Sequence, residues 1–183
     1  MPLNISASGT TSNISFGPAT IKMGPVAGNT PSTDVGFIGE DGVTVEMTSE
    51  KKIISQGNPR LPLYSFVQAQ DVMLNFTSIQ WDFDNFIYAL GGGTTSGGGN
   101  VFQFGGNALN ELVAIQLEHQ MAVTNNTMMV YVWKAQSESG FTVPFGQDEH
   151  SFEFQFRAIR AADDWAGAAL ADGQQLIKFE RLT

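Results

Sequence analysis

The chain has 183 residues, a length that suits one ordinary domain, and 18 Asp and Glu against 9 Lys and Arg give a formal net charge of −9. It contains no cysteine, which excludes disulfides, thiolate metal sites and cysteine nucleophiles. Lys51-Lys52 is the only adjacent basic pair, so the sequence lacks the clustered cations that nucleic-acid-binding proteins use to neutralise phosphates.

The start of the sequence does not resemble a signal peptide, because Met1 to Thr20 lacks a basic start followed by an apolar run. No stretch approaches the roughly 18 consecutive apolar residues that a membrane-spanning helix needs. We therefore expect synthesis in a cytoplasm and no membrane partner. Ser, Thr, Asn and Gly dominate the first residues, which predicts a flexible N-terminal arm over 1–18 and a single domain over 19–183.

In the first part of the domain, a strand is predicted over Ala19–Met23, ended by Gly24-Pro25. Val43, Val45 and Met47 then alternate with polar residues, which is typical of a half-buried strand.

Residues 49–65 break this alternation and carry apolar side chains without strict periodicity. The segment is too long for a tight hairpin, so we predict a loop. The loop either folds onto its own domain or extends and is covered by another subunit. Under the second interpretation, the inter-subunit residues are Ile53, Ile54, Pro59, Leu61, Leu63 and Tyr64.

The clearest helix signal follows an alternating strand over 71–76. Thr77 with Gln80 three residues later predicts a capping box, and Gly91 predicts the C-terminal end. The glycine-rich stretch 91–106 has no lysine and follows a helix, so we predict a flexible connector rather than a phosphate-binding loop. An apolar stripe at helical spacing, predicted to face the core, comprises Ile79, Phe83, Phe86, Ile87 and Leu90.

The second half alternates at period two, which predicts strands over 113–121, 129–133 and 152–156. A short helix is predicted over 163–171, with Asp163 as its cap, and a last strand over 174–182. Together the elements predict a mainly β (α+β) fold, an antiparallel β-sandwich or barrel-like domain with one flanking α-helix and a long hairpin loop.

Candidate catalytic residues are few. His119 lies on the apolar side of its strand, and His150 is expected in a solvated acidic turn rather than in a metal site. No Gly-x-Ser-x-Gly occurs, and Asp163-Asp164 has no companion feature that suggests acid–base chemistry. We therefore expect no enzymatic activity, no cofactor and no metal.

The order of elements resembles the tail tube proteins of siphophages and related bacterial tube proteins. The resemblance lies in the strand Gly42–Glu46, the 49–65 segment, the strand Gln70–Thr77 and the run Phe83-Asp84-Asn85-Phe86-Ile87-Tyr88-Ala89-Leu90-Gly91-Gly92. It covers about residues 19–92, whereas the glycine-rich insertion and the N-terminal arm depart from the family.

The resemblance implies a structural virion protein without catalytic residues. Its subunits would form stacked rings, generally hexameric, whose inner strands close into one barrel around a DNA channel. It also implies a location in the phage tail and contacts with the tape measure, terminator and distal tail proteins. DNA would be a non-specific passing cargo.

If such a channel forms, the polar positions of half-buried strands are expected to line it, because each faces opposite to an apolar set. Any one of them could instead lie under the helix or on the outer wall. The candidates are Asp71, Asn75, Gln116, Glu118, Gln120, Glu153 and Gln155.

Two other functions fit the sequence. One is another phage structural role, in head decoration or tail completion. The other is a carbohydrate-binding β-sandwich, which would expose Trp or Tyr on a shallow face. Trp81, Trp133 and Trp165 are scattered, and two of them are expected to be buried, which disfavours the carbohydrate-binding module.

Overall fold

A computed structural model describes residues 17, 19–26, 30–106, 110–121, 126–140, 142–143, 145 and 150–182. Apart from Gly17, the predicted N-terminal arm over 1–18 lies outside these residues. Residues 122–125, which follow the predicted strand over 113–121, lie outside them too.

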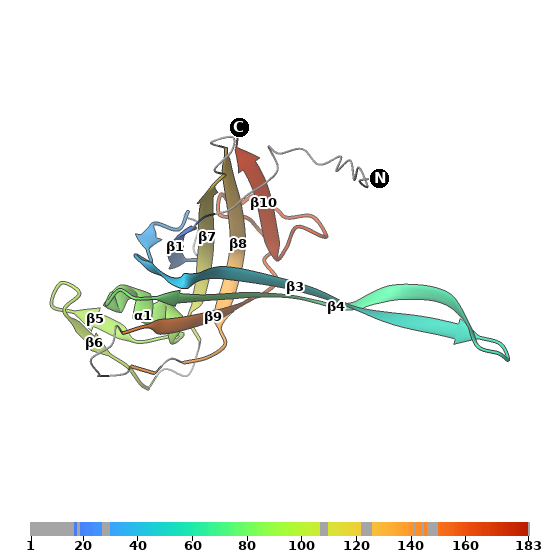
Figure 1. Cartoon of the computed structure of the whole chain (residues 1–183), viewed down its shortest axis with the longest axis horizontal. Coiled ribbons are helices and arrows are strands. Elements are labelled where there is room, and N and C mark those ends of the chain that lie inside the picture. Colours follow the sequence, from blue (N-terminus) through green and yellow to red (C-terminus); the bar gives the residue numbers. More distant parts are fainter. Residues whose placement is uncertain are drawn as a thin grey trace, which may run out of the picture.

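Within the described ranges the chain forms ten strands and one helix (Figure 1). They are β1 (Thr20–Pro25), β2 (Thr33–Asp34), β3 (Ile38–Gln56), β4 (Leu61–Ser78), α1 (Phe83–Ala89), β5 (Thr94–Ser96), β6 (Val101–Gln103), β7 (Leu112–Gln120), β8 (Thr127–Ser137), β9 (Phe152–Ala158) and β10 (Ile177–Leu182). All strand pairs are antiparallel, which confirms the predicted mainly β fold with one helix.

The main sheet forks at β8. Its strand order is β2-β1-β7-β8-β9-β4-β3, with β10 as an additional partner of β8. One edge of β8 pairs with β7, whereas the other pairs first with β10, over 127–132, and then with β9, over 135–137. The two branches cross in Figure 1, β1-β7-β8-β10 against β9-β4-β3. The layers expected of a sandwich are thus two branches of one sheet.

Aromatic side chains fill the core between the branches. Phe154 lies edge-on to Phe76, with ring centroids 5.2 Å apart, and Phe156 stacks on Phe76 at 5.9 Å. Phe86 of α1 reaches Phe152 of β9 at 5.0 Å, so the helix closes one end of the core. The cluster also includes Ile21, Met23, Leu74, Ile115 and Val132.

The helix begins later than predicted, and the capping box at Thr77 is wrong. Thr77 stays on β4, paired with Glu153 of β9, because strand pairing continues to Ser78. Asp82 is the N-cap instead, and its carboxylate accepts a hydrogen bond from the Asp84 N–H at 3.0 Å. Gly91 ends the helix as predicted, with φ of +64°.

The predicted apolar stripe is core only in part. Phe86 is buried, whereas Phe83, Ile87 and Leu90 are half-buried. Ile79 precedes the helix and is 36% exposed, because the helix starts at Phe83.

Three other predictions are corrected. The 49–65 segment is not a loop, because β3 and β4 continue through it to a turn at 57–60. The glycine-rich stretch 91–106 holds the hairpin β5-β6, whose Phe102 contacts Phe86 with ring centroids 5.8 Å apart. The helix over 163–171 is absent, because the Asp164 carboxylate accepts the N–H groups of Ala166 and Ala168 in a turn.

We predict that Phe86→Ala lowers the free energy of unfolding by about 3–5 kcal/mol, because it leaves a cavity among packed rings. Urea titration followed by tryptophan fluorescence measures this loss. The matched control is Phe37→Ala, since Phe37 is 73% exposed, and it should change stability by less than about 0.5 kcal/mol. Equal stabilities for the two variants would show that the Phe86 ring is not a core element.

Candidate functional site

The β3-β4 hairpin projects far beyond the body of the molecule (Figure 1). We call its outer part, residues 51–68, the ribbon; it begins beyond the Glu50–Ala69 pair. Every residue from Glu46 to Gln70 is exposed. The ribbon therefore packs against no other element in the part of the chain that the structure describes.

The ribbon carries large apolar side chains that are mostly in solvent. Tyr64 is 67% exposed, Leu61 63%, Leu63 62% and Ile53 60%. Ile54 is also exposed, and Pro59 lies in the turn at the tip. All six residues predicted from sequence to contact another subunit thus lie together on this element.

The strand register places apolar residues on both faces of the ribbon. Tyr64 is opposite Ile54, and Phe66 is opposite Lys52, on one face. Val67 is opposite Lys51 on the other face, which also carries Ile53. Because each face mixes apolar residues with polar ones such as Lys51 and Lys52, period-two alternation is confined to Tyr64–Phe66, and sequence reasoning did not recognise the strands.

Phe66 and Val67 were missed by sequence reasoning, although they are 39% and 49% exposed. The alternation of Tyr64, Ser65 and Phe66 was the signal that could have found them.

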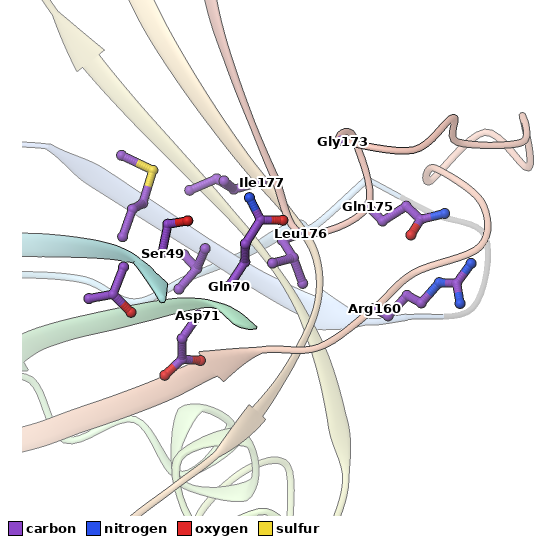
Figure 2. Close-up of a pocket in the computed structure, with 11 residues that line it drawn as sticks. Ser49, Gln70, Asp71, Arg160, Gly173, Gln175, Leu176 and Ile177 are labelled. Carbon is purple, nitrogen blue, oxygen red and sulfur yellow. The ribbon is translucent and has the colours of Figure 1, made fainter. Parts of the chain in front are cut away.

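A groove of about 480 Å³ opens at the fork of the sheet, where the base of the hairpin faces β10. In Figure 2, Ser49 and Gln70 extend from the hairpin side, and Leu176 and Ile177 from the β10 side. Met47 also lines the groove and is 56% exposed, whereas the core residue Val72 beneath it stays buried.

Two strand edges are unpaired beside this groove. Among the described residues, β3 pairs only with β4, and β10 pairs only with β8. Exposed strand edges are templates for pairing with another chain.

The seven predicted channel residues come from both branches of the sheet. Glu118, Gln120 and Glu153 are exposed, and Asn75 is paired with Gln155 across β4 and β9. Gln116 is 9% exposed, so its side chain is not available to line a channel in the single chain.

Asp71 is engaged in an ionic network. Its carboxylate lies 3.0 Å from Arg157 Nη1, and Arg157 Nε lies 3.0 Å from a carboxylate oxygen of Glu138. One guanidinium thus joins β4, β9 and the end of β8. The channel-facing role of the seven residues stays a prediction.

A second polar cluster lies on β8 and β10. The hydroxyl of Tyr131 is hydrogen-bonded to Glu180, and burial together with this bond raises its pKa. Hydrogen bonds from Lys178 and Tyr131 lower the pKa of the Glu180 carboxyl. Lys178 also lies 5.2 Å from the Tyr131 ring centroid, which indicates a structural cross-strand contact.

Two of the three tryptophans are buried. Trp133 and Trp165 are each 7% exposed, and their rings pack edge-on with centroids 5.2 Å apart. Trp133 also donates its indole N–H to the carbonyl of Gln174 at 2.9 Å. Trp133 and Trp165 hold the segment after β9 against the sheet. Of the three tryptophans, only Trp81 is exposed and could contact a ligand or partner.

Among the described residues, no group of three or more His, Asp or Glu side chains is placed to hold a metal ion. In the same part of the chain, no helix is long and apolar enough to cross a membrane. Neither the family models nor the curated proteins contain a match to this chain.

We predict that the ribbon exchanges its amide hydrogens much faster than the base of the same hairpin in the free chain. A two-stranded ribbon without a packed face is marginally stable in water, whereas Val72–Phe76 is anchored in the core. Hydrogen exchange with mass spectrometry compares peptides from 51–68 with peptides from 72–76. Equal protection of the two would mean that the ribbon is stable by itself.

Proposed function

We propose that this chain is a structural protein that assembles with copies of itself into stacked rings and forms the tail tube of a phage. The observation that carries the proposal is the ribbon, with seven large apolar side chains exposed on two faces. Exposed apolar patches of this kind mark protein-contact sites in soluble proteins.

Association would give the ribbon the apolar burial and the strand pairing that it lacks in a single chain. Contact with another subunit would remove apolar side chains on both faces from water, at roughly 25 cal/mol per Å² of buried area. Pairing of the free edges of β3 and β10 with strands of a neighbour would also satisfy their open hydrogen-bonding groups. Both features support an assembling protein rather than a solvated monomer.

The acidic charge of the chain suits a channel that DNA crosses. A net charge of −9 and few basic residues give phosphates little to bind, so DNA would pass without adhering. In this proposal the rings are hexameric, as in the family that the sequence resembles, and the tube contacts other tail proteins in the virion.

We predict that replacing 51–68 by Asn-Gly leaves a folded chain that no longer assembles. Asn-Gly closes a two-residue hairpin between the paired residues Glu50 and Ala69, and the core side chains of both strands remain. Sedimentation velocity and negative-stain electron microscopy of both proteins at rising concentration measure the outcome. The original chain should give rings or tubes, and the shortened chain monomers.

Assembly by the shortened chain would show that the ribbon is not required for assembly. A monomeric original chain at every concentration would contradict the proposed function itself.

We predict that Glu118→Lys with Glu153→Lys leaves tubes that assemble but release DNA slowly. Both residues are exposed and lie opposite to core positions on their strands. Lysines in a narrow channel attract phosphates over a Debye length, roughly 8 Å at physiological salt. Asp163→Lys with Asp172→Lys, an equal charge change at exposed positions outside β7 and β9, is the control. Normal DNA release by the first variant, with its lysines in the channel, would refute the electrostatic role.

A further inference from the structure

Charge is unevenly divided between the ribbon and the rest of the chain. The ribbon holds Lys51, Lys52 and Arg60 and no acidic residue, a net charge of +3. The remainder keeps 6 Lys and Arg against its 18 Asp and Glu, which is −12. A basic, apolar ribbon is therefore complementary to an acidic surface that also exposes apolar groups.

Such a surface lies at the α1 end of the molecule. Phe145, Trp81, Phe83, Phe102 and Phe104 form a continuous series of ring contacts, with successive centroids 6.1, 6.3, 6.0 and 6.5 Å apart. The rings at its two ends are the most exposed, Phe145 at 86% and Phe104 at 64%. We call the surface formed by these five rings the aromatic face.

The aromatic face carries acidic and no basic residues along its main segment. Residues 79–106 contain Asp82 and Asp84 and neither Lys nor Arg. The Asp84 carboxylate is exposed and accepts a hydrogen bond from the Thr95 hydroxyl at 3.0 Å, which fixes it between α1 and β5. Val101, beside these rings on β6, is 44% exposed.

The ribbon cannot reach this face within one chain. Figure 1 places the tip of the hairpin and the α1-β5-β6 region at opposite ends of the longest axis. When two complementary surfaces lie at opposite ends of one molecule, copies bind head to tail in a heterologous contact. Each copy then binds one neighbour through its ribbon and another through its aromatic face. The occupant that fits is therefore a second copy of this chain.

We infer that the ribbon of one copy docks on the aromatic face of the next copy. Apolar ribbon side chains such as Tyr64 would lie against the exposed rings, and Lys52, on the same face of the ribbon, near Asp82 and Asp84. This inference rests on the proposed self-assembly and adds the surface that receives the ribbon.

Disulfide trapping tests the contact directly, because the chain has no cysteine of its own. A chain with Tyr64→Cys is mixed with a chain with Phe104→Cys under assembly conditions and oxidised. The control mixture pairs Tyr64→Cys with Ala166→Cys, whose parent residue is exposed in the turn after Trp165, away from the aromatic face. Mass spectrometry identifies the linked peptides.

The inference predicts cross-linked dimers in the first mixture at a yield at least about tenfold above that of the control. One chain that carries both substitutions should give a ladder of multimers, since the contact is heterologous. Ile54→Cys with Phe104→Cys is a second pair that keeps the Tyr64 ring, because Ile54 lies opposite Tyr64 on the same face of the ribbon.

Failure of the docking inference can be distinguished from failure of the proposed self-assembly. If the unmodified chain assembles but neither pair links above the control, the ribbon binds elsewhere and the inference is overturned, while the proposed function stands. If the unmodified chain does not assemble at all, the proposed function and the inference both fail.

Charge reversal gives an independent readout. Lys51→Glu with Lys52→Glu should raise the concentration needed for assembly by at least about tenfold, and adding Asp84→Lys should recover part of this loss. An unchanged assembly concentration in the Lys51→Glu, Lys52→Glu variant would contradict the assigned charge pairing.

Discussion

A two-stranded ribbon cannot bury its own side chains, because it has no third strand and no second layer. In this protein the constraint falls on residues 51–68, where apolar groups occupy both faces of β3 and β4. A polar outer face would have made the hairpin an ordinary solvated projection. Apolar groups such as Tyr64 on one face and Ile53 on the other are instead exposed on two sides, and in the proposed assembly another subunit covers them.

The body of the protein gives this ribbon a fixed base. Both of its strands continue into the core, where Val72, Leu74 and Phe76 are buried against the phenylalanines of β9. The hairpin is therefore anchored by the same packing that stabilises the fold. Continuous strands, not a flexible loop, connect the ribbon to the core. Because the helix α1 closes the opposite end, the aromatic face is equally fixed relative to that core.

Strands with one buried face, such as β9 and the inner part of β4, could be predicted from their alternation. Phe152, Phe154 and Phe156 alternate with polar residues, and the alternation alone placed that strand. The ribbon has no buried face and alternates only at Tyr64–Phe66, so its strands were missed. The helix start was missed because pairing of Thr77 with Glu153 outweighed a local capping motif. The six inter-subunit candidates were found from apolar content alone, whereas the aromatic face depends on contacts between distant segments, Phe145 with Trp81 among them.

Electron cryomicroscopy of material assembled from the purified chain can show whether a neighbouring subunit covers the ribbon. We expect rings or tubes in which density for 51–68 of each subunit is ordered and packed against a neighbouring subunit. Assemblies in which these residues project into solvent would contradict it, and so would a chain that remains monomeric at every concentration.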